Sequence, residues 1–130
     1  MADVEYLNVA DYVVIASEVL ACTEADILRV LKIAGASSAI GAPATNYFEV
    51  ELFPDFDVKV AVLGYRLLRN HPLPDGNKRC AFLAMIEMAE RNGKTWTVVD
   101  DDDTVKTIES AAAGSIDEAA FIDWVHRQII

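Results

Sequence analysis

The stretch Asp55–Phe82, DFDVKVAVLGYRLLRNHPLPDGNKRCAF, indicates a buried helix, a polar loop and the start of a second helix. Asp55 can cap the first helix, which is apolar around most of its circumference; only Lys59, Arg66 and Arg69 mark a polar strip. A helix that is apolar nearly all round belongs in the middle of a bundle. We therefore expect this helix to be the centre of the fold.

The segments before this stretch favour helices with recognisable starts. Asn8 can cap a first helix, and Thr23 with Asp26 three residues later can cap a second. The following stretch, GASSAIGAPATN (Gly35–Asn46), has no periodic face, so we expect a surface loop. Tyr47–Phe53 alternates weakly and predicts a short strand or an extended flap.

The segments after it continue the helical pattern. A helix is expected from Gly76 to Arg91, then a brief extended piece over residues 94–100, a helix over 104–113 preceded by the acidic run 100–103, and a last helix through His126. Ser115 and Glu118 match a capping box for that last helix. The predicted fold class is all-α: a compact single-domain helical bundle over residues 1–130, with at most a short extended flap.

The amino-acid composition limits the kinds of partner that we expect for this chain. The chain has 130 residues, 53% of them hydrophobic, and a net charge of −10, which argues against a general nucleic-acid or anionic-membrane binder because both need a basic face. Two cysteines are too few for a disulfide framework. The acidic start resembles no signal peptide, and no apolar run approaches the ~20 residues of a membrane span. We expect a cytoplasmic protein without direct nucleic-acid or membrane partners.

The loop between the two central helices holds several side chains that can bind a ligand or take part in catalysis. It holds His71, Asp75, Asn77, Lys78 and Arg79 within nine residues, among two prolines and a glycine. Each residue alone has an ordinary structural explanation, such as turn formation, helix capping or solvation. Both residues before a proline are restricted to extended conformations, so residues 71–74 should form a stiff, non-helical connector.

The set as a whole points to a bound anion. A helix N-terminus carries about half a positive charge and several unpaired N–H donors, so Lys78 and Arg79 are unfavourable there unless an anion is present. Backbone donors, an ammonium and a guanidinium make a phosphate site, to which Asn77 adds a neutral donor. A single carboxylate such as Asp75, with phosphate oxygens and water, is how Mg²⁺ is usually held. His71 can act as a general base.

HPLPDGNKRCAF (His71–Phe82) resembles the signature of the Fic/Doc superfamily, in particular its Doc (death on curing) toxin branch. The similarity is clear from about Asp55 to Gly93. It implies an all-α domain in which His71 is the general base and Asp75 the Mg²⁺ ligand, while Gly76, Asn77, Lys78 and Arg79 bind the phosphates of ATP or another nucleoside triphosphate.

The resemblance also implies a function: the toxin of a toxin–antitoxin pair, a protein kinase that phosphorylates a Thr or Ser hydroxyl of a translation factor, with elongation factor Tu as the expected target and a Phd-like antitoxin as partner. Lys78, where Fic proteins have glycine, and Phe82, where they have a second arginine, favour the Doc branch. Leu73 replaces the usual aromatic anchor of the loop. Tyr47–Phe53 is a candidate substrate-docking flap.

Three alternatives stay open. The chain can be a Fic-type AMP transferase acting on a protein hydroxyl, or a catalytically weak binding module. A Cys80–His71 nucleophile is the third, because Cys80 lies about one turn into a helix whose dipole lowers a thiol pKa. His126, near a helix C-terminus, is expected to be structural.

Overall fold

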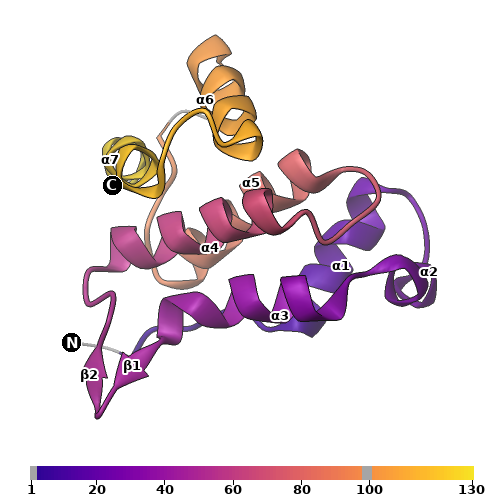
Figure 1. Ribbon diagram of the computed structural model, residues 1–130, viewed down its shortest axis with the longest axis horizontal. Helices are drawn as coiled ribbons and strands as arrows, with labels where there is room; N and C mark the ends of the chain where they lie inside the picture. Colours follow the sequence, from indigo (N-terminus) through magenta and orange to yellow (C-terminus); the bar gives the residue numbers. More distant parts are fainter. Residues whose placement is uncertain (1–2, 98–100) are drawn as a thin grey trace.

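Helix α4 (Phe56–Asn70) is the centre of the molecule, as the sequence predicts. The computed structural model describes residues 3–97 and 101–130, so residues 98–100, including Asp100 of the acidic run and the end of the predicted extended piece, lie outside it. Helices α3, α5, α6 and α7 all contact α4. In Figure 1, α1 and α3 lie on one side of the α4–α5 pair, and α6 and α7 lie on the other. The fold is all-α, with one two-stranded sheet among the described residues.

Two of the helices begin at the capping residues that the sequence predicts. Asn8 and Thr23 form capping boxes with residues three positions on, opening α1 (Val9–Val19) and α2 (Glu24–Val30). Helix α5 spans Asn77–Arg91. Two further helices, α6 (Asp102–Ala113) and α7 (Glu118–Gln128), follow it in the chain. The side chain that caps α7 belongs to Asp117, so the predicted Ser115 capping box is wrong.

The expected surface loop 35–46 is wrong for most of its length. Helix α3 covers Ile33–Gly41 and continues into the 3₁₀ turn η1 (Ala42–Ala44). Ala36 and Ala39 are fully buried, because their small side chains let α3 lie close against α4. The helix is stabilised by burial, which a sequence rich in Gly, Ala and Ser does not reveal.

A hairpin joins η1 to α4. Strands β1 (Asn46–Tyr47) and β2 (Val50–Glu51) pair antiparallel, which matches the short extended flap expected here. The hairpin folds over Lys59, whose side chain is 1% exposed, so the prediction that Lys59 belongs to a polar surface strip is wrong. Its ammonium donates to the carbonyl of Pro43 and to the Glu51 carboxylate, which replace the lost water.

Close contact between α4 and α5 sets the geometry of the centre. A Cβ atom on Gly64 would lie 2.2 Å from Sδ of Met85, a fully buried residue of α5. A larger residue at this position would therefore force the buried Met85 side chain to move.

A continuous column of aromatic rings joins α4, α5 and α7. Successive centroids lie 5.5–5.7 Å apart in the order Tyr65, Phe121, Trp124, Trp96, Phe82. Edge-on and tilted contacts at this spacing are the favourable geometry for aromatic pairs. The indole of Trp124 also donates to Asp103 of α6 at 3.0 Å, so part of the acidic run serves the fold.

Among the described residues, no single helix has the length and apolar composition needed to cross a membrane. Residues 24–30 and 33–44 together satisfy both criteria, but only as a pair bent by 103°.

Candidate functional site

His71 is the point at which α4 stops. Its backbone is left-handed, with φ 51° and ψ 55°, whereas the following proline predicts an extended conformation. A left-handed cap of this kind terminates a helix and turns the chain sharply. The His71 side chain is exposed to solvent, so the imidazole can meet a substrate.

The connector after His71 is held by Asn77. The Asn77 side chain is 5% exposed; its Oδ1 accepts the N–H of Leu73 at 3.0 Å, and its Nδ2 donates to the carbonyl of Leu73 at 2.7 Å. Leu73 is itself 2% exposed and so anchors the loop without the usual aromatic ring. The Asn77 side chain therefore holds the connector in place, and its contact with phosphate stays a prediction.

The first turn of α5 lacks the usual helix cap. Its N-cap is Gly76, with φ 77°, and no side chain bonds to the turn. Asp75 instead accepts the N–H of Gly76 itself at 2.8 Å. Side chains cap α1, α2, α6 and α7, and each of those helices has an acidic residue in its first turn. Helices α3 and α4 also lack a side-chain cap, so the predicted cap by the Asp55 side chain is wrong, but α4 has an acidic residue in its first turn. The backbone donors at the start of α5 are therefore available to an anion.

One cavity of about 290 Å³ brings the predicted site residues together. Its lining consists of His71, Pro74, Asp75, Gly76, Asn77, Lys78 and Arg79. Every residue predicted for the base, the metal ligand and the phosphate cradle lies on this one wall. A cavity of this composition suits a charged, phosphate-sized group.

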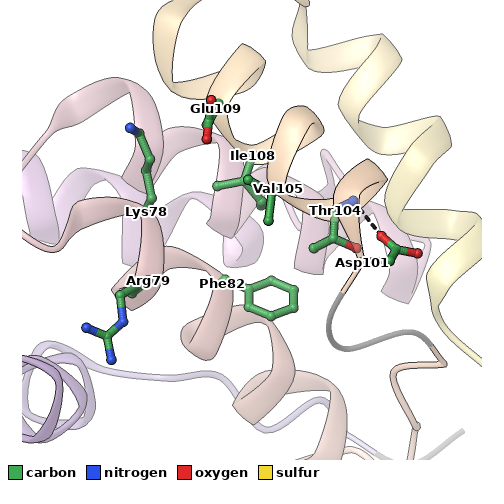
Figure 2. A pocket seen from close by; sticks show the side chains of 8 residues that line it. All are labelled: Lys78, Arg79, Phe82, Asp101, Thr104, Val105, Ile108 and Glu109. Atoms are coloured by element: carbon green, nitrogen blue, oxygen red, sulfur yellow. Dashed lines mark hydrogen bonds between the residues drawn. The ribbon is translucent and has the colours of Figure 1, made fainter.

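Lys78 and Arg79 have no carboxylate within 4.0 Å in the part of the chain that the structure describes. Most other arginines on the helices are committed, for example Arg66 to Glu118 and Arg91 to Asp11. Figure 2 shows the Lys78 and Arg79 side chains leaving the first turn of α5 in different directions. The two cations therefore flank the cavity and can contact different parts of a ligand.

A second pocket of about 250 Å³ lies between α5 and α6 and shares both cations. Phe82 of α5 faces Val105 and Ile108 of α6 across it (Figure 2). Polar groups at its margin are Asp101, Thr104 and Glu109. This pocket was not predicted from the sequence; the signal that could have found it is the i, i+3 spacing of Val105 and Ile108 on a helix that otherwise bears many charges.

Cys80 cannot serve as a nucleophile with His71. It is fully buried, and this burial raises the pKa of the thiol to about 11, although the nearby Arg79 acts in the opposite direction. At neutral pH the thiol stays protonated, and the thiolate is the reactive form. Cys80 is part of the buried core.

Among the residues that the structure describes, Asp75 is the one carboxylate that lines the His71 cavity. Across residues 3–97 and 101–130 there is no group of three or more His, Cys, Asp or Glu side chains arranged to hold a metal ion. Asp75 is exposed, and one of its two carboxylate oxygens accepts a single N–H bond. This donor set fits Mg²⁺ carried in with a polyphosphate, which supplies the other oxygens, and does not fit a metal held by protein alone.

The predicted flap does not line this cavity. The hairpin precedes the first residue of α4 and His71 follows the last, so the two lie at opposite ends of a 15-residue helix, about 22 Å long (Figure 1). His126, expected to be structural, also lies at the hairpin end, where its Nδ1 is 2.7 Å from the Asp57 carboxylate.

The model of the Fic/DOC family matches residues 6–89, which run from the start of α1 to near the end of α5 and include all residues of the His71 cavity. No curated protein shows significant similarity to the chain.

Proposed function

The chain belongs to the Fic/Doc family, and from that premise we propose that it is a Doc-type protein kinase that transfers the γ-phosphoryl group of a nucleoside triphosphate to a Thr or Ser hydroxyl of a translation factor. Members of this family are transferases that modify proteins with phosphate or AMP. We expect elongation factor Tu as the target, and inhibition of translation as the result.

One observation carries the proposal. The uncapped first turn of α5, two cations without ion-pair partners among the described residues, and an exposed imidazole share one cavity. In a chain of net charge −10, such a local concentration of unneutralised positive charge has a clear use in binding a polyphosphate. Phosphoryl transfer needs mainly positioning and charge stabilisation, and these groups supply both.

His71 is the proposed general base. A neutral ring nitrogen of His71 takes the proton of the target hydroxyl as the hydroxyl oxygen forms its bond to Pγ. The bond between Pγ and the β–γ bridging oxygen breaks, and the nucleoside diphosphate leaves with the electron pair. The backbone donors of α5, with Lys78 and Arg79, hold the phosphate oxygens in line for this displacement.

Asp75 is the proposed Mg²⁺ ligand. A magnesium ion shared between this carboxylate and the phosphates would neutralise charge that develops on the phosphate oxygens. The hydrogen bond from Gly76 to Asp75 orients the carboxylate at the edge of the cavity before the ion arrives.

The apolar pocket beside Phe82 is suited to the nucleoside. It adjoins the phosphate cavity through Lys78 and Arg79, and its wall includes a ring on which a planar base can stack. Kinase activity is preferred over AMP transfer because Lys78 adds bulk and charge at the point where Fic proteins have glycine, and because Phe82 removes the second arginine of the Fic signature.

Regulation and location complete the proposal. A separate Phd-like antitoxin controls the toxin, and both act in the cytoplasm. Growth arrest on induced expression, relieved by Asp75→Ala, is the expected phenotype. A chain that is only a binding module would give the same growth with or without Asp75.

The decisive experiment incubates the protein with Mg²⁺, elongation factor Tu and ATP that is labelled on either the α-phosphate or the γ-phosphate. Label from the γ-phosphate on the factor, absent with His71→Ala, supports the kinase. Label from the α-phosphate instead supports AMP transfer and overturns the kinase. Full transfer by His71→Ala would eliminate His71 as the base.

A further inference from the structure

The β1–β2 hairpin exposes a concentrated set of large apolar side chains. Tyr47 is 73% exposed, Phe48 92%, Val50 68% and Leu52 56%. The rings of Tyr47 and Phe48 contact each other edge-on, with centroids 5.5 Å apart, which leaves their faces open. Contiguous apolar surface of this kind on a small domain marks an interaction site more often than scattered single residues do.

The hairpin tip carries an aromatic residue in a strained backbone conformation. Phe48 and Glu49 both have positive φ, 50° and 67°. A two-residue turn of this geometry strongly favours Asn-Gly or similar pairs, which adopt it at little cost. A bulky residue in a left-handed conformation is an outlier that points to a functional constraint.

The hairpin is also firmly attached to the fold. The buried ammonium of Lys59 donates to Glu51 of β2 at 3.0 Å and to the Pro43 carbonyl at 3.2 Å, and it lies over the Tyr6 ring. The N–H of Leu52 bonds to the carbonyl of Thr45 at 2.9 Å. The aromatic tip is therefore presented on a braced support.

The chain segment that carries the hairpin is acidic. The sequence from residue 33 to 58 contains four carboxylates and no lysine or arginine. A cavity of about 510 Å³ at the first turn of α4 is lined by Asp55 and Asp57, with Asp123 and His126 from α7. Of these, Asp57 is bonded to His126, and Glu51 to Lys59. Glu49, Asp55 and Asp123 remain to attract positive charge.

We propose that the hairpin is the docking site for a basic, apolar segment of a partner protein. Apolar side chains of that segment pack on Phe48, Tyr47 and Val50, while its lysines or arginines meet the nearby carboxylates and the open faces of the rings. A second copy of this chain is disfavoured because it would bring like charges together. An anionic membrane is disfavoured for the same reason.

This surface is independent of the transferase proposal. The hairpin and the His71 cavity lie at opposite ends of α4 (Figure 1), so a segment docked on the hairpin leaves His71 open. The test therefore measures binding and does not depend on activity.

The probe is a short synthetic peptide that alternates leucine and lysine, compared with leucine–glutamate and serine–lysine peptides of equal length. NMR titration of the labelled protein should shift residues 46–58 with the leucine–lysine peptide. Phe48→Ser should weaken binding about tenfold, as for the loss of one aromatic anchor. Higher salt should weaken it further. The matched control Val14→Ser, at an exposed apolar position on α1, should bind as the original chain does.

Four results would overturn the proposal: no binding by any peptide, equal binding of the lysine and glutamate peptides, equal binding of the serine–lysine peptide, or unchanged affinity in Phe48→Ser. Sedimentation supplies a fifth. Self-association that Phe48→Ser abolishes would identify a second copy as the occupant instead.

Discussion

Asn77 holds both backbone polar groups of Leu73, accepting its N–H at 3.0 Å and donating to its carbonyl at 2.7 Å. A residue in the first turn of α5 thus fixes the connector that follows His71. The base and the phosphate-binding turn are joined by this one side chain, so the geometry of the proposed site depends on a residue that need not touch the substrate with its side chain.

Asn77→Ala should lower both stability and transfer. It leaves the N–H and the carbonyl of buried Leu73 without partners, at a cost of about 2 kcal/mol in the free energy of unfolding. Urea unfolding measures the stability, and γ-label on the target measures activity at a temperature where the variant remains folded. Asn77→Asp, which keeps an acceptor but loses the donor, should be impaired as well. Full activity in both variants would contradict a positioning role.

Removing the unpaired cations should weaken nucleotide binding. Lys78→Gln and Arg79→Gln should each raise the Kd for ATP by about tenfold, because a charge-assisted contact to phosphate is lost, and binding should become less sensitive to salt. Titration calorimetry at two ionic strengths measures both effects. Lys106→Gln makes the same charge change at an exposed position on α6 outside the pockets and should leave the Kd unchanged. An equal effect of Lys106→Gln would indicate a general field effect.

Gly64→Ala should destabilise the fold by about 1–3 kcal/mol, because its Cβ would overlap the buried Met85 side chain and force that side chain to repack. The matched variant Gly41→Ala adds the same methyl group at a helical position where nothing lies within 4 Å. It should be neutral or stabilising by about 0.5 kcal/mol. Thermal unfolding of the pair measures the difference, and similar Tm values would refute the packing argument.

Alkaline pH should destabilise the protein through Cys80. The pKa of the buried thiol is about 11, against an ordinary value of 9.0. Below pH 9 the thiol is neutral in both folded and unfolded chains and has no effect. Between pH 9 and 11 the unfolded chain ionises first, so the free energy of unfolding falls as pH rises. Cys80→Ala should show a shallower decline in urea unfolding over that interval.

Relief of the hairpin strain should raise stability. Phe48→Gly and Glu49→Gly each place glycine at a positive φ and should add about 1 kcal/mol to the free energy of unfolding. Thermal unfolding measures this gain. Phe48→Gly should lose peptide docking at the same time, a trade typical of positions kept for binding. A loss of stability in both variants would show that the turn is not strained.

Local rules predicted much of the fold. Caps at Asn8 and Thr23, the end of α4 at Asn70 and the start of α5 beside Gly76 depend on neighbouring residues alone, and the structure has them. Helix α3 was missed because its stability comes from Ala36 and Ala39 packed on α4, a tertiary effect. Lys59 was misassigned for the same reason. The residues that cover it lie outside α4, so the pattern of the helix alone does not show that Lys59 is buried.

The site divides in a similar way. The motif brought the residues of the His71 cavity together in sequence, and the fold keeps them on one wall. The bonds from the Asn77 side chain to Leu73 were not predicted, because only the structure shows that Leu73 lies within its reach. The pocket beside Phe82 was missed because α5 and α6 meet only in three dimensions.

The column of rings from Tyr65 to Phe82 has a practical consequence. Trp96 lies edge-on to Phe82, which lines the pocket proposed for the nucleoside, and Trp124 is next in the column. The chain has only these two indoles. Its tryptophan emission should therefore change when a ligand fills the pocket beside Phe82, so ligand titrations can be followed without attaching a dye.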